Sequence, residues 1–142
     1  MRIYAAIAAT TLFSSASVAG ANEHALDGRY AFYQAATAAE MDRGPRNDAD
    51  CRKFIASALF ESRNRSEDLQ ISGNRWQDNQ DVTLVTGNVI LKTSKGGVIP
   101  FTIDIESEGD SGPAKGTVKR VGQLGLSVAI SGQVLHYCKM GD

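Results

Sequence analysis

The second half of the chain alternates hydrophobic and polar residues with a period of two. Ile99, Phe101, Ile103 and Ile105 form the clearest run, and glycine-containing segments separate it from similar runs before and after it. This alternation is typical of antiparallel strands that bury one face. We therefore predict roughly seven to nine short strands, which form a mainly β antiparallel meander closed as a small barrel or stacked as a sandwich.

One turn near the C-terminus predicts which residues share a face. If Ser131-Gly132 is a two-residue turn, Leu126 lies opposite Tyr137 and both side chains point into the core. A slip of one residue would reverse the two faces. The opposite face would carry small residues together with a histidine and a cysteine, namely Gly125, Ser127, Ala129, Val134, His136 and Cys138.

Two further dipeptides resemble hairpin turns. Gly87-Asn88 lies between the apolar runs 82–86 and 89–93, so we predict a hairpin there. A turn at Gly73-Asn74 would place Trp76, the single tryptophan, opposite Ile71 in the core. Without that turn, Trp76 beside Arg75 in a polar stretch would have the composition of an interface anchor.

A period of 3.6 appears once, in the first half of the chain. Cys51, Phe54, Ile55, Ala58 and Leu59 share one face of a helix that we predict over about residues 49–62. Asn47 or Asp48 can cap its first turn. An aromatic segment, residues 29–34, could open the sheet. We expect the helix to pack outside the sheet, on the face of small residues.

Cys51 and Cys138 are the only cysteines. Two cysteines in an exported chain usually form one disulfide. This bridge would close a loop of about ninety residues, which the chain-entropy model values at roughly 4–5 kcal/mol. It would also hold the helix against the last strand.

The first 21 residues have the pattern of a secretory signal peptide. Arg2 precedes an apolar run, and Ala19-Gly20-Ala21 resembles a cleavage site. The apolar run is shorter than the roughly 20 residues that span a bilayer. We predict a signal peptide over residues 1–21, a single β-rich domain over residues 22–142, a periplasmic or secreted location and no membrane span.

Charge and chemistry narrow the function further. The chain has 15 basic and 16 acidic residues, so no strong positive field would attract nucleic acid. His136 has no supported nucleophile beside it in the sequence, and we interpret it as structural. Asp104, Glu106, Glu108 and Asp110 do not follow the spacing of a calcium loop. We predict no catalytic residues, no bound metal and no cofactor.

The C-terminus resembles one family at the level of architecture. An exported β-barrel that ends in the Ser131-Gly132 turn, an aromatic strand with Tyr137, and Cys138 looks like the periplasmic C-type lysozyme inhibitors. Their inhibitory segment resembles Ser-Gly-x-x-Tyr, whereas here Gln133-Val134-Leu135-His136 precede Tyr137. No inhibitory residue can therefore be carried over.

The resemblance and the missing catalytic set imply a binding protein. We predict an exported, non-enzymatic protein that contacts another exported or envelope protein, in its most concrete form an inhibitor of a peptidoglycan hydrolase. Its candidate contacts are Arg75, Trp76 and the turn over residues 107–113, which contains Ser111. The alternative is a lipocalin-like carrier whose barrel holds a small apolar ligand.

Overall fold

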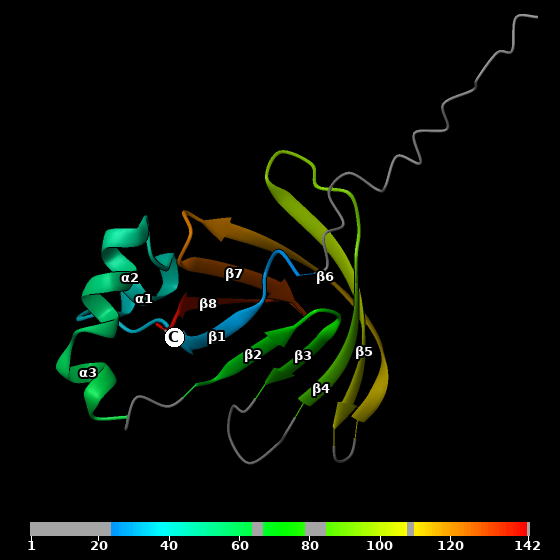
Figure 1. Ribbon diagram of the computed structural model, residues 1–142, viewed down its shortest axis with the longest axis horizontal. Helices are drawn as coiled ribbons and strands as arrows, with labels where there is room; N and C mark the ends of the chain where they lie inside the picture. The colour runs from blue at the N-terminus through cyan, green and yellow to red at the C-terminus, as the bar shows by residue number, and fades with distance from the viewer. Residues whose placement is uncertain (1–23, 64–66, 79–84, 108–109, 142) are drawn as a thin grey trace, which may run out of the picture.

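The structure, a computed structural model, describes residues 24–63, 67–78, 85–107 and 110–141. Its eight strands form one closed antiparallel barrel in which each strand pairs with the next and β8 closes on β1 (Figure 1). The predicted signal peptide, residues 1–21, lies outside the described residues. The strands are β1 (Gly28–Phe32), β2 (Leu69–Ser72), β3 (Arg75–Asp78), β4 (Val85–Leu91), β5 (Val98–Ser107), β6 (Asp110–Val121), β7 (Gly125–Ile130) and β8 (Gln133–Lys139).

The predicted β7–β8 register is confirmed. Leu126 pairs with Tyr137, and Ile130 pairs with Gln133 across the turn. Ser131 has a φ of 53° and Gly132 has a φ of 75°. Two successive positive φ angles are what a type I′ hairpin requires. Leu126 and Tyr137 are both buried in the barrel, as the alternation predicts.

The hairpin predicted at Gly87-Asn88 is wrong, because β4 runs straight through both residues. Trp76 pairs with Gly87 across the β3–β4 ladder and is only 5% exposed. A glycine within a strand often marks the close approach of another group. β4 pairs here with β3 on one side and β5 on the other, and the local dipeptide signal does not reveal these pairings.

The turn predicted over residues 107–113 is too long. β5 continues to Ser107 and β6 begins at Asp110, so Gly112 and Pro113 belong to a strand. β7 pairs with β6 only from Gly116 onward. Pro113 therefore lies where β6 has a neighbour on one side, which is a position that tolerates the missing N–H of proline.

The helix predicted over residues 49–62 is two helices, α2 (Asp48–Ile55) and α3 (Ala58–Glu61), and α1 (Ala38–Arg43) precedes them. Ser57 separates them. Its hydroxyl donates to the carbonyl of Phe54 at 2.6 Å and accepts from the N–H of Phe60 at 3.4 Å. Serine thus ends one helix and caps the next. In Figure 1 the three helices lie together on one side of the barrel. Among the described residues no helix is long and apolar enough to cross a membrane.

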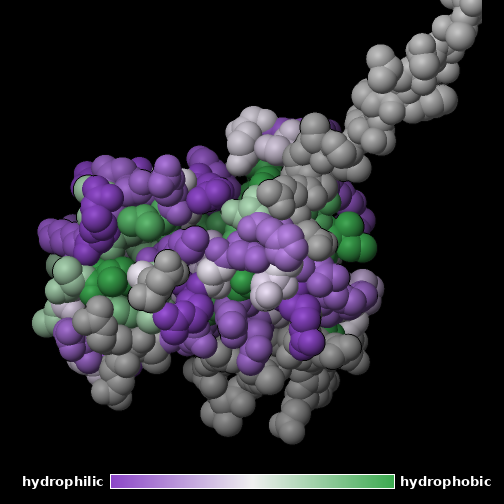
Figure 2. Space-filling view, in the orientation of Figure 1, coloured by the Kyte–Doolittle hydropathy of each residue, from purple (hydrophilic) through white to green (hydrophobic). Residues whose placement is uncertain are grey.

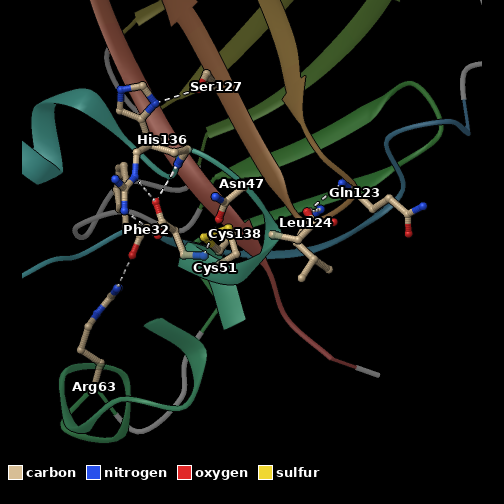
Figure 3. Close-up of a disulfide and its surroundings, with 12 residues drawn as sticks. Phe32, Asn47, Cys51, Arg63, Gln123, Leu124, Ser127, His136 and Cys138 are labelled. Atoms are coloured by element: carbon tan, nitrogen blue, oxygen red, sulfur yellow. Dashed lines mark hydrogen bonds and ion pairs between the residues drawn. A yellow bond between two sulfur atoms is a disulfide. The ribbon is translucent and has the colours of Figure 1, made fainter. Parts of the chain in front are cut away.

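The predicted disulfide between Cys51 and Cys138 is present and joins α2 to β8 (Figure 3). Both cysteines are fully buried. Around them Ala31, Phe54 and Phe60 form a small core outside the barrel. The helices therefore pack on the outer face of the sheet, as predicted. A disulfide is consistent with an oxidising compartment.

The main core fills the barrel interior and closes one of its ends. Leu26 is 1% exposed, and its carbonyl accepts a hydrogen bond from the Tyr30 hydroxyl at 2.7 Å. Arg120 donates to the carbonyl of Ala25, and the N–H of Gly73 donates to Asp27. The segment before β1 therefore closes this end of the barrel.

Candidate ligand pocket in the barrel

A cavity of about 200 Å³ lies inside the barrel, towards the end opposite Leu26. It is lined mainly by inward-facing side chains of β3, β5, β7 and β8. An eight-stranded barrel is about the smallest that can hold one small ligand. The lining residues are Leu69, Trp76, Asp78, Phe101, Ile103, Ile105, Val128, Ile130, Ser131, Leu135 and Tyr137.

Trp76 lines this cavity. Its indole packs against Phe101 with the ring centroids 5.0 Å apart. Its Nε1 is buried and has no hydrogen-bond partner within the described residues. Buried polar groups nearly always have a partner, and an unsatisfied one costs about 1–3 kcal/mol. A residue that lines the cavity thus holds a buried donor without a partner among the described residues.

Asp78 contributes a carboxylate to the cavity lining, and Tyr137 contributes a phenol. Tyr137 is 2% exposed. Burial raises the pKa of its hydroxyl above the ordinary value, and the negative charges of Asp78 and Asp68 raise it further. Tyr137 therefore remains a neutral phenol at physiological pH. None of the described residues that line the cavity is a lysine, arginine or histidine.

The structure places the predicted binding residues Arg75, Trp76 and Ser111 in different environments. Arg75 is exposed on the outer face of β3, whereas its neighbour Trp76 points into the barrel. This confirms the core placement of Trp76 that a turn at Gly73-Asn74 predicts. Ser111 lies in β6, where its backbone pairs with Glu106, but its side chain is outside the described part of the structure.

His136 is covered by α1. One ring nitrogen, Nδ1, lies 2.7 Å from the Ser127 hydroxyl (Figure 3). The other, Nε2, lies 2.9 Å from the carbonyl of Asp42. Gly44, with a φ of 78°, lies so close that a Cβ there would clash with the imidazole ring. With both nitrogens engaged, His136 joins α1 to the sheet. The described residues contain no group of three or more potential metal ligands.

A second hollow, of about 260 Å³, lies beside the helices. Tyr33, Phe54 and Leu59 contribute apolar surface to it, and Arg46 forms an ion pair there with Asp50. Figure 2 shows a largely hydrophilic surface with smaller apolar areas over the helical side. Unlike the barrel cavity, this hollow does not contain a buried polar group without a partner among the described residues.

The sequence pointed to many of the aliphatic lining residues but not to the polar ones. Trp76 is predicted in the core, but whether its ring lines a cavity depends on neighbours from other strands. Asp78 is not among the predicted pocket residues. Alternation along β3 nevertheless places Asp78 on the same side of the strand as Trp76.

Comparison of the chain with protein-family models, with curated proteins and with solved structures finds no match. The resemblance to the lysozyme inhibitors therefore stays a prediction.

Proposed function

We propose that this protein is a non-enzymatic binding protein that holds a small apolar molecule inside its barrel. The observation that carries the proposal is the apolar cavity inside the barrel, which is lined by Trp76, a residue whose buried N–H has no partner among the described residues. A ligand that draws this N–H toward its own acceptor atom would remove the cost of leaving the donor unpaired. Its apolar part would gain about 25 cal/mol for each Å² removed from water.

The size of the cavity limits the ligand to about one ring. A cavity of about 150 Å³ is enough to bind benzene. The cavity here, about 200 Å³, leaves room for one ring with short substituents. Most of the barrel interior is filled by the bulky side chains of the main core, among them Leu126, Val118 and Tyr30. The proposed ligand is therefore smaller than a long-chain lipid.

The experiment is a titration with neutral one-ring compounds, led by 4-methoxybenzyl alcohol. Because Trp76 is the only tryptophan, its fluorescence reports directly on the cavity. We expect a saturable change in intensity or wavelength. Native mass spectrometry of protein purified from its own host should show an adduct. No saturable response from any member of the panel would contradict the proposal.

Comparison of wild type with Trp76→Phe, using two compounds that differ in one acceptor atom, isolates the role of the indole N–H. Trp76→Phe keeps an aromatic ring but removes the donor. Calorimetry should show weaker binding of 4-methoxybenzyl alcohol by about fivefold to tenfold, the value of one hydrogen bond. 4-Ethylbenzyl alcohol, which lacks the ether oxygen, should bind wild type and Trp76→Phe alike.

A hydrolase inhibitor is the second candidate function. What supports it is an outer-face hollow between β4 and β5 that includes Ile90, a residue 67% exposed. Arg75 pairs with Asn88 at the edge of this hollow. A lysis assay with equimolar protein tests this function. Undiminished lysis by several peptidoglycan hydrolases would contradict it, and inhibition that Arg75→Ala abolishes would support it.

A further inference from the structure

We propose that the hollow beside the helices is a second binding site, which takes a small monocarboxylate that carries an apolar ring. This site does not depend on the ligand proposed for the barrel. The juxtaposition that carries it is two cations without ion-pair partners in the described part of the chain, Arg43 and Lys53, beside an apolar floor that includes Phe54.

The hollow has apolar surface for the ring of a ligand. It lies on the helical side of the molecule (Figure 1) and measures about 260 Å³. Phe54 is 3% exposed, and its ring meets Tyr33 edge-on with the centroids 5.8 Å apart. Leu59 also lines the hollow and is 43% exposed. A ring that covers these side chains would remove apolar surface from water, which favours binding.

Five charged side chains line the hollow, and two of them cancel each other. Asp50 accepts from the backbone N–H and the Nε of Arg46 through Oδ2, and from a terminal guanidinium nitrogen through Oδ1. Both of its carboxylate oxygens are therefore engaged. The other three are Glu40, Arg43 and Lys53, two positive charges against one negative, which leaves a net charge of +1. This balance complements one negative charge on a ligand.

The two cations reach the hollow from different helices. Arg43 lies in the last turn of α1 and Lys53 in the last turn of α2. Neither makes a hydrogen bond or an ion pair with another described residue. Both are therefore available to donate to a carboxylate, and such charge-assisted hydrogen bonds are the stronger kind.

Tyr33 adds a neutral donor to the same hollow. Its hydroxyl has no hydrogen-bond partner among the described residues and is not sealed from solvent. Burial raises the pKa of Tyr33 above its ordinary value, and the negative charges of Asp50 and Glu40 raise it further. The hydroxyl therefore keeps its proton at neutral pH and can donate to an anion.

Three related probes test the site: 3-phenylpropionate, 3-phenylpropanamide and 3-phenylpropylamine. Calorimetry at about pH 7 should give the tightest binding for the propionate. The amide should bind about fivefold more weakly, because its hydrogen bonds lack the charge, and the amine more weakly still. In NMR spectra, the propionate should shift the amide signals of residues 33–36 and of α1 and α2.

Variants of exposed residues separate the charges. Arg43→Gln combined with Lys53→Gln should bring the affinity for the propionate to within about twofold of that for the amide. The control is Arg52→Gln, which removes the same charge from α2 at a residue that does not line the hollow, and it should change nothing. Glu40→Gln should tighten the binding of the propionate by about twofold to threefold, because it removes a like charge.

The outcomes separate this site from the barrel cavity. Ile105 lines the barrel cavity and not the hollow, so Ile105→Phe should leave the binding of the propionate unchanged. Loss of binding in that variant would place the probe in the barrel and overturn the second site. Equal affinities for the three probes, or a preference for the propionate that survives in the double variant, would overturn the role of the cations. Binding of neutral one-ring compounds alone would support the barrel site and overturn this one.

Discussion

At the scale of single residues, Asp68 is the buried carboxylate that joins the helical side to the barrel. It is 7% exposed and accepts the N–H of Phe32 at 2.8 Å. Arg63 donates to both of its oxygens at 2.6 Å and also reaches the carbonyl of Phe32. One side chain therefore satisfies a backbone donor and a guanidinium together, which makes it sensitive to loss of charge.

We expect Asp68→Asn to lower the free energy of unfolding by about 1.5–3 kcal/mol, the usual value of hydrogen bonds to charged groups. Urea denaturation measures the change. Asp104→Asn, on the exposed outer face, should change it by less than about 0.5 kcal/mol. Equal effects of the two substitutions would show that the Asp68 contacts add little.

Asp50 predicts a dependence of stability on pH. Hydrogen bonds from the side chain and backbone N–H of Arg46 lower the pKa of Asp50 from 3.8 to about 2. The contribution of this carboxylate is therefore complete above pH 3.8 and is lost as pH falls towards 2. Because Arg46 is 63% exposed, solvent screens the pair and its contribution to stability should be small.

The check compares wild type with Asp50→Asn. The variant should be less stable at about pH 6, and the difference should shrink as pH falls through about 2 and vanish below it. Titration of the Asp50 carboxyl by NMR gives the pKa directly. A midpoint near 3.8 would contradict the role of Arg46.

At the scale of elements, a turn is predicted correctly where the hydrophobic alternation of the strands on both sides fits it. Ser131-Gly132 has matched alternation on both sides, so turn and register supported each other. Gly87-Asn88 has the same local signal, but β4 continues through it and pairs with both β3 and β5. The break between α2 and α3 depends on the Ser57 hydroxyl, which can either end a helix or begin one. Whether a strand or helix ends at such a residue therefore depends on tertiary contacts, which the local sequence pattern does not show.

The disulfide is the main tie between two such elements. We expect Cys51→Ala with Cys138→Ala to lower the free energy of unfolding by up to about 4–5 kcal/mol, because the bridge spans 87 residues. The strand signal in circular dichroism should persist, since the barrel core does not include either cysteine.

Guanidinium denaturation measures this loss, and reduced wild type should match the double variant. Equal midpoints for oxidised and reduced wild type would show that the helices are held mainly by the apolar contacts of Phe54 and Phe60.

At the scale of the whole molecule, the barrel is sealed at one end and hollow near the other. The sequence predicts many of the apolar inward positions but not whether they fill the space. That outcome depends on volumes summed over all eight strands, and it is not a property of any one of them. At the sealed end Leu26 and Leu126 are each 1% exposed. At the other end Ile105, Ile130 and Leu135 stay partly buried beside the cavity.

A cavity that stays open for a ligand should lower the free energy of unfolding. A larger side chain that fills the cavity should raise it again. We expect Ile105→Phe to fill part of the hollow and raise the free energy of unfolding by about 0.5–2 kcal/mol, as cavity-filling changes commonly do. The same variant should bind 4-methoxybenzyl alcohol at least about tenfold more weakly, because the ring competes for the same volume. Val134→Phe is the control, since Val134 is 58% exposed on the outer face of β8 and should leave binding unchanged. A more stable Ile105→Phe variant with undiminished affinity would place the ligand outside the barrel.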